Sequence, residues 1–153
     1  MTRPAAAPAA TILAAVLVLL LPGPAPAQPA RAPDADATWR ARLICDPLPP
    51  ISATRRHANF LLTVAGGVAR YERVLLDTEG AASFVERGQG RVDPDGSLTL
   101  EGSGTGRGVR FPTRYSGRLQ ADGLGDLRGR QEWGPDSPVG QRTRPCHMRL
   151  WRQ

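Results

Sequence analysis

The chain has 153 residues, which is enough for one domain once a short leader is set aside. Hydrophobic residues make up 41% of the chain, so one compact core is possible, whereas 17 glycines and 15 prolines argue against an all-helical fold. The formal charge is +6, and every basic residue is arginine. A basic chain can bind nucleic acid or an anionic surface. Because alanine, glycine and proline are abundant together with arginine, a GC-rich genome explains the bias better, and nucleic acid is not the expected partner.

Residues 1–27 have the features of a secretory signal peptide. An arginine near the start precedes an apolar run at 9–21, and Ala25-Pro26-Ala27 forms an A-x-A cleavage site. The run is shorter than the roughly 17–25 residues that a membrane-spanning helix needs. We therefore expect export to the periplasm or the medium, with no membrane-spanning segment. Residues 28–37 are rich in Pro and Ala and are expected to be a disordered tail, which leaves 38–153 as a single domain.

Two cysteines, Cys45 and Cys146, lie near the two ends of the expected domain. In an exported chain without a C-x-x-C motif, this arrangement favours a disulfide over a metal or redox pair, although two separate thiols remain the alternative. Such a bridge would join the first structured segment to the last.

Strand-like alternation begins at residue 38 and continues through 45. Three prolines then indicate a loop at 46–58. The segments 59–65 and 68–76 meet across Gly66-Gly67, a pair that suits a two-residue hairpin turn. In this register the apolar residues of both strands share one face.

A second hairpin is expected between 88–93 and 97–102, with Gly96 in the left-handed position of the turn. Its first strand should begin near Ser83, with Phe84 in the core. The glycine-rich stretch 102–108 is expected to be a flexible loop, because it lacks the spacing of a phosphate-binding motif.

The longest alternating run, 109–119, is followed by a turn at 121–125 and a strand at 126–133. After a loop at 134–142, the last strand covers 143–151. Seven or eight short strands with hairpin connections predict an all-β antiparallel meander, closed as a small barrel or folded as a sandwich. The expected disulfide between the first and last strands favours closure.

No catalytic or cofactor motif is recognisable, so no cofactor and no metal are expected. A non-enzymatic role is favoured, and an enzyme whose site the sequence does not reveal is the further alternative. His57 and His147 lack a third ligand partner in the sequence and are expected at the surface. The specific function does not follow from these residues alone.

The strands at 109–119 and 126–133 carry a candidate ligand wall. If Leu119 pairs with Leu127, two glycines face each other and leave a gap beside polar and aromatic side chains on the inner face. The members of this wall are Thr113, Tyr115, Gly117, Gly129, Gln131 and Trp133. The alternative is a bent wall around a filled core.

The same register gathers three arginines on the outer face, Arg118, Arg128 and Arg130. Like charges placed opposite each other destabilise a sheet, so this patch would favour an anionic ligand such as a lipopolysaccharide phosphate or an acidic polysaccharide. A solvated surface is the alternative.

The segments W-R-A-R-L-I-C, L-R-G-R-Q-E-W and R-P-C-H-M-R-L resemble a group of small exported bacterial β-rich proteins of unknown function. In architecture the chain is also similar to avidin-like and lipocalin-like barrels and to exported metalloprotease inhibitors. The lipocalin G-x-W is absent, however, because Trp39 follows Ala37-Thr38, and the cysteine spacing differs from that of the inhibitors. These likenesses imply shape only.

The sequence thus predicts an exported β-barrel that binds a small ligand or an anionic envelope component. The alternative is an inhibitor or protein-interaction module that acts through the loops 46–58 and 134–142.

Overall fold

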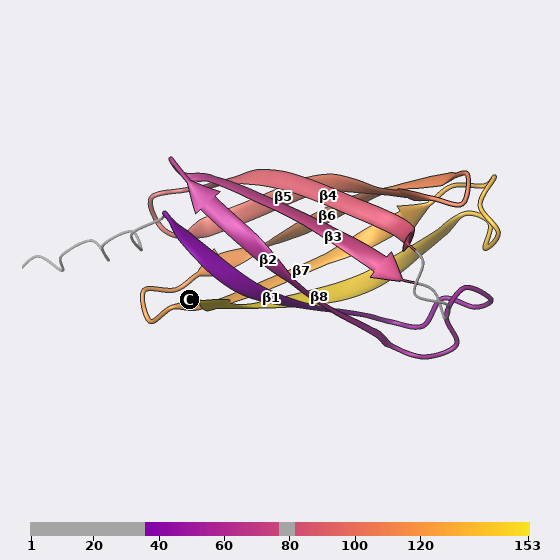
Figure 1. The fold of residues 1–153 in the computed structure, drawn as a ribbon, viewed down its shortest axis with the longest axis horizontal. Coiled ribbons are helices and arrows are strands. Elements are labelled where there is room, and N and C mark those ends of the chain that lie inside the picture. The colour runs from indigo at the N-terminus through magenta and orange to yellow at the C-terminus, as the bar shows by residue number, and fades with distance from the viewer. Residues whose placement is uncertain (1–35, 77–81) are drawn as a thin grey trace, which may run out of the picture.

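The computed structural model describes residues 36–76 and 82–153 and shows eight antiparallel strands in a closed barrel (Figure 1). Consecutive strands pair with each other, and β8 pairs with β1. The strands are β1 Ala37–Cys45, β2 Arg56–Ala65, β3 Val68–Leu76, β4 Ala82–Val92, β5 Ser97–Gly106, β6 Val109–Leu119, β7 Leu124–Trp133 and β8 Arg142–Arg152. The predicted meander is confirmed, and it closes as a barrel rather than folding as a sandwich.

The expected signal peptide and residues 28–35 of the expected tail lie outside the described residues. Ala37, which we assigned to the tail, is already the first residue of β1, where it faces Val64 of β2. In the part of the chain that the structure describes, no helix is long and apolar enough to cross a bilayer.

Both predicted hairpins are confirmed in register. Gly66 and Gly67 have φ values of 56° and 71°, as a primed two-residue turn requires, and Leu62 of β2 faces Tyr71 of β3. In the second hairpin Gly96 has a φ of 86°, and Val92 faces Leu98 while Gly90 faces Leu100.

Two expected loops are shorter than the sequence indicated. Strand β2 begins at Arg56, so the loop expected at 46–58 ends earlier and His57 lies in a strand. Strand β5 continues to Gly106, so the expected flexible loop at 102–108 is reduced to a turn at Arg107-Gly108. The glycines of this segment are needed for close packing inside the strand: a Cβ atom on Gly104, for example, would lie 2.0 Å from Phe111 Cζ. This glycine makes room for an aromatic ring instead of loosening the backbone.

The barrel interior contains two apolar clusters. The larger one extends from the end of the barrel at the start of β1 to the disulfide and includes Trp39, Tyr115 and Met148. The smaller one lies at the other end, where Leu48 and Val139 of the two long loops pack with Phe111 and Trp133. The loops therefore use apolar side chains to cover this end of the barrel.

The predicted disulfide is confirmed, and it links facing positions of β1 and β8, Cys45 and Cys146. Strands β2 and β3 are joined less completely than any other neighbours, because their pairing covers only Leu62–Ala65 and Val68–Tyr71. Beyond these residues, 56–61 of β2 and 72–76 of β3 are not paired with each other. A lateral opening in the barrel wall results.

Candidate functional site

The predicted ligand wall is on the inner face of the barrel, as expected, but its register differs. Strands β6 and β7 are shifted by two residues from the predicted pairing, so Gly117 faces Leu127 and Tyr115 faces Gly129. The predicted gap between two glycines is therefore wrong. The shift follows from a tighter turn, in which the Gln120 N–H donates to the Leu124 carbonyl. The ring of Tyr115 covers Gly129 instead, because a Cβ atom there would lie 2.6 Å from Tyr115 Cδ1.

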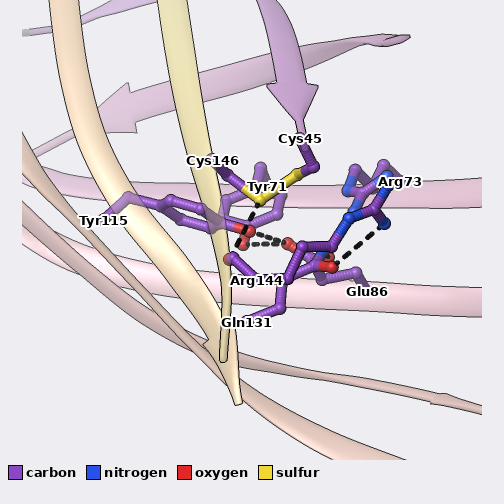
Figure 2. Close-up of polar contacts among 8 residues, drawn as sticks. All are labelled: Cys45, Tyr71, Arg73, Glu86, Tyr115, Gln131, Arg144 and Cys146. Carbon is purple, nitrogen blue, oxygen red and sulfur yellow. Dashed lines mark hydrogen bonds and ion pairs between the residues drawn. A yellow bond between two sulfur atoms is a disulfide. The ribbon is translucent and has the colours of Figure 1, made fainter. Parts of the chain in front are cut away.

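Four members of the wall have buried side chains: Thr113, Tyr115, Gln131 and Trp133. Two of them, Tyr115 and Gln131, contact a carboxylate that the sequence analysis did not single out, that of Glu86 in β4 (Figure 2). Glu86 is fully buried. The structure thus brings the predicted wall together with an ionised network inside the barrel.

The Glu86 carboxylate accepts hydrogen bonds at both oxygens. Its Oε1 accepts from the Tyr71 hydroxyl at 2.8 Å and from the Tyr115 hydroxyl at 3.0 Å. Its Oε2 accepts from Gln131 Nε2 at 3.0 Å and from Arg73 Nη2, with which it forms a buried ion pair. Four donors from three strands, β3, β6 and β7, thereby hold one carboxylate, which is what a buried anion requires.

Both tyrosines are fixed as neutral donors in this network. Burial is the main cause that raises the pKa of Tyr71 and of Tyr115, and the negative charge of Glu86 raises both pKa values further. Neither hydroxyl therefore supplies a negative charge that could balance a second cation.

A second cation is present, and no carboxylate among the residues that the structure describes forms an ion pair with it. Arg144 of β8 is 5% exposed; its Nε donates to the Asp46 carbonyl, and its Nη1 lies 3.5 Å from Gln131 Oε1. Its Nη2 is buried without any hydrogen-bond partner. Burial is the main cause that lowers the pKa of Arg144, and the charge of Arg73 lowers it further. In the described part of the chain, the interior therefore holds two arginines against one buried glutamate.

The unpaired atoms of Arg144 and Trp133 belong to residues that line one cavity of about 70 Å³ at the covered end of the barrel. Phe84, Phe111 and Trp133 supply an aromatic side, with the last two rings stacked at a centroid distance of 4.2 Å. Trp133 Nε1 is also buried without a partner. An apolar surface beside unpaired donors and a cation is the usual composition of a small-molecule site. We call this space the mouth cavity.

A second cavity, of about 180 Å³, lies at the lateral opening between β2 and β3. It shares Arg56, Leu75, Leu76 and Arg144 with the mouth cavity. Arg144 therefore lines two adjoining cavities. A ligand held at Arg144 has room to extend toward the opening in the wall.

The three arginines of the predicted patch are exposed on the outer face, but their register differs from the predicted one and two of them form ion pairs. Arg118 faces Asp126 rather than Arg128, and its Nη2 lies 2.6 Å from Asp95 Oδ2. Arg130 forms an ion pair with Glu132. The changed facing of Arg118 follows from the two-residue shift between β6 and β7, whereas the two ion pairs are with a residue of the β4–β5 turn and with a residue of β7 itself. Arg128 faces Ser116 on one side and His147 on the other.

The two histidines lie on the outer side of the barrel, on either side of Ile44. His57 Nδ1 lies 3.2 Å from Arg42 Nη2, and His147 Nε2 lies 2.6 Å from Asp126 Oδ2. Among residues 36–76 and 82–153, no group of three or more potential metal ligands is found.

Comparison of the chain with protein-family models, curated proteins and solved structures gives no match. The resemblance to small exported bacterial proteins therefore stays a prediction. Arg73, Glu86 and Arg144 had a signal in the sequence, because each lies two residues from a position that we assigned to the core: Tyr71, Phe84 and Cys146. Period-two alternation places them inside the barrel.

Proposed function

We propose that this protein is an exported binding protein for a small carboxylate with an apolar or aromatic body. The carboxylate is held at Arg144, and the body lies against the aromatic side of the mouth cavity, formed by Phe84, Phe111 and Trp133. The cavity of about 70 Å³ has room for about two waters at liquid density, so it takes the carboxylate and the first carbon atoms, and a longer body continues toward the lateral opening. The disulfide is compatible with an oxidising compartment.

One observation carries the proposal: Arg144 is a buried cation with an unpaired donor, and within 36–76 and 82–153 no carboxylate forms an ion pair with it. An uncompensated charge in the interior is costly, and charge-assisted hydrogen bonds to a carboxylate relieve that cost. The unpaired Trp133 Nε1 offers a further donor in the same cavity. An anion is therefore favoured over a neutral ligand of equal shape.

The test is isothermal titration with phenylacetate and hexanoate, each compared with its uncharged amide. We expect saturable binding of at least one acid and at least tenfold weaker binding of the amide, because a charged hydrogen bond is worth about 1.5–3 kcal/mol. Arg144→Gln should weaken binding of the acid by a similar factor. Arg110→Gln, on the outer face of β6, is the matched control and should leave binding within twofold.

The same titrations can also refute the proposal. If neither acid binds at millimolar concentration, or if the amide binds as tightly as the acid, the assignment of a carboxylate site is wrong. Unchanged binding in Arg144→Gln would show that the ligand lies elsewhere.

A further inference from the structure

The outer face of β2, β1, β8 and β7 carries a row of exposed apolar side chains. Leu61 is 52% exposed, Trp151 40% and Leu124 46%. Arg40 faces Leu61 on one side and Trp151 on the other, and Trp151 faces Leu124. Three of the five large exposed hydrophobic residues among those the structure describes therefore lie side by side in one row, interrupted by one cation. We call Leu61, Arg40, Trp151 and Leu124 the amphiphilic row.

The next row along the strands adds positive charge. Arg42 of β1 directly faces Arg149 of β8, a like-charge pair that destabilises a sheet when nothing screens it. The acidic residue beside them, Asp126, faces Arg149 but contacts His147 Nε2 at 2.6 Å. Arg40 and Arg149 form no ion pair with any residue in 36–76 or 82–153. This face thus combines an exposed tryptophan and two leucines with three arginines.

We propose that this face docks on the surface of an anionic lipid bilayer. Tryptophan and leucine side chains enter the boundary between head groups and acyl chains, and arginines bind the negatively charged head groups. A soluble polyanion such as a polysaccharide or a nucleic acid would need the arginines only. The adjoining Leu61, Trp151 and Leu124 favour a lipid surface, because exposed apolar patches bordered by cations gain from partial burial in it. The proposal does not depend on the mouth cavity.

The natural tryptophans give a direct readout of docking. Trp39 and Trp133 are buried, so Trp151 is the accessible one among the chain's three. Full-length protein is mixed with vesicles of phosphatidylcholine alone or with added phosphatidylglycerol, and bound protein is separated by sedimentation. We expect binding only to the anionic vesicles, protection of Trp151 from a soluble quencher, and at least tenfold weaker binding in high salt.

Variants distinguish docking from nonspecific charge attraction. Trp151→Ala should weaken binding at least fivefold, and the double variant Arg40→Gln/Arg149→Gln at least tenfold. Arg91→Gln is the control, since it removes an exposed arginine from β4, on the far side of the barrel. It should change binding by less than twofold.

Three outcomes would overturn the proposal. The first is no binding to the anionic vesicles. The second is an equal loss in Arg91→Gln, which would show that net charge alone attracts the protein. The third is binding to heparin as tight as to the vesicles while Trp151 stays quenchable, which would assign the face to a soluble polyanion.

Discussion

Replacement of Glu86 by Gln tests whether the interior is organised by one buried charge. The substitution keeps the size of the side chain and removes its charge. Oε1 can still accept from Tyr71 and Tyr115, but an amide NH₂ takes the place of Oε2, which accepts from Arg73 and Gln131. The donors Arg73 Nη2 and Gln131 Nε2 would then face the amide donor of the new glutamine, and the Arg73 guanidinium would lose its counter-ion.

The expected loss is large because both partners are buried. The Arg73 and Glu86 side chains are 4% and 0% exposed, and removing one partner of a buried ion pair costs about 3–5 kcal/mol. Glu72 provides the matched control. It pairs with Arg87 at 2.7 Å, but the side chains of Arg87 and Glu72 are 65% and 53% exposed, so Glu72→Gln should cost no more than about 1 kcal/mol.

Unfolding in guanidinium chloride with the disulfide intact measures both losses as changes in the free energy of unfolding. Adding Arg73→Met to Glu86→Gln removes the stranded cation, so the double variant should recover about 1–3 kcal/mol of the loss. The reasoning is refuted if Glu86→Gln costs no more than Glu72→Gln. It is also refuted if Arg73→Met adds its own loss in full instead of recovering part of it.

Three further outcomes follow from the same structure. The chain's two tyrosines are buried and have raised pKa values, so no tyrosinate absorbance should develop in the folded protein near pH 10. Because only the unfolded chain ionises there, the free energy of unfolding should fall above that pH by about 1.4 kcal/mol per pH unit for each tyrosine. Ionisation of the tyrosines of the folded protein near pH 10 would contradict this prediction. Reduction of the Cys45–Cys146 bridge should lower the free energy of unfolding by about 4–5 kcal/mol, measured in urea with and without reductant, whereas a loss below about 1 kcal/mol would contradict the loop-entropy reasoning. Gly90→Ala should lower the free energy of unfolding by about 1–3 kcal/mol, since its Cβ would lie 1.8 Å from a backbone oxygen of β5. In the same assay Gly134→Ala, whose Cβ would meet nothing within 4 Å, should be neutral. Equal effects of the two substitutions would show that the close approach at Gly90 is unimportant.

Most of the barrel was predictable because its strands alternate strictly and its hairpins have specific turn residues. The pair Gly66-Gly67 and the left-handed Gly96 fix the register of two hairpins, and both registers were predicted correctly. Pairing of the first and last strands was predicted from the disulfide rather than from any local pattern. Local chemistry and one covalent constraint together therefore determined the topology.

The wrong predictions concern segments rich in glycine, because a glycine can indicate either a flexible loop or turn, or a close approach within a strand. In β5, Gly104 lies against the Phe111 ring and Gly102 against the backbone of β4, but from the sequence alone the same residues indicate a flexible loop. Between β6 and β7, several turn residues fit more than one loop length, and a change of two residues keeps every side chain on its face. Alternation therefore could not reveal the wrong register, although the register decides which side chains meet.

The site was only partly predictable for a related reason. Alternation placed Gln131 and Trp133 inside, and it could equally have placed Glu86 and Arg144 there. What it cannot give is the set of partners, since Glu86 binds side chains from β3, β6 and β7 that are 13 to 45 residues away in sequence. Whether a charged residue at an inward position belongs to a binding site depends on whether residues of the other strands balance its charge.

That balance links the fold to the proposed ligand. Arg73 is neutralised by Glu86, whereas Arg144 is held by a carbonyl and an amide oxygen that carry no net charge. Other inward positions of β8 are occupied by apolar residues such as Met148 and Leu150, so an apolar side chain is compatible with this face of the strand. A bound carboxylate would bring the interior to two cations and two anions and would use the unpaired Arg144 Nη2. Because the buried Arg144 carries the cost of an unmatched charge, part of the ligand's affinity comes from relieving that cost, and binding should stabilise the fold in proportion.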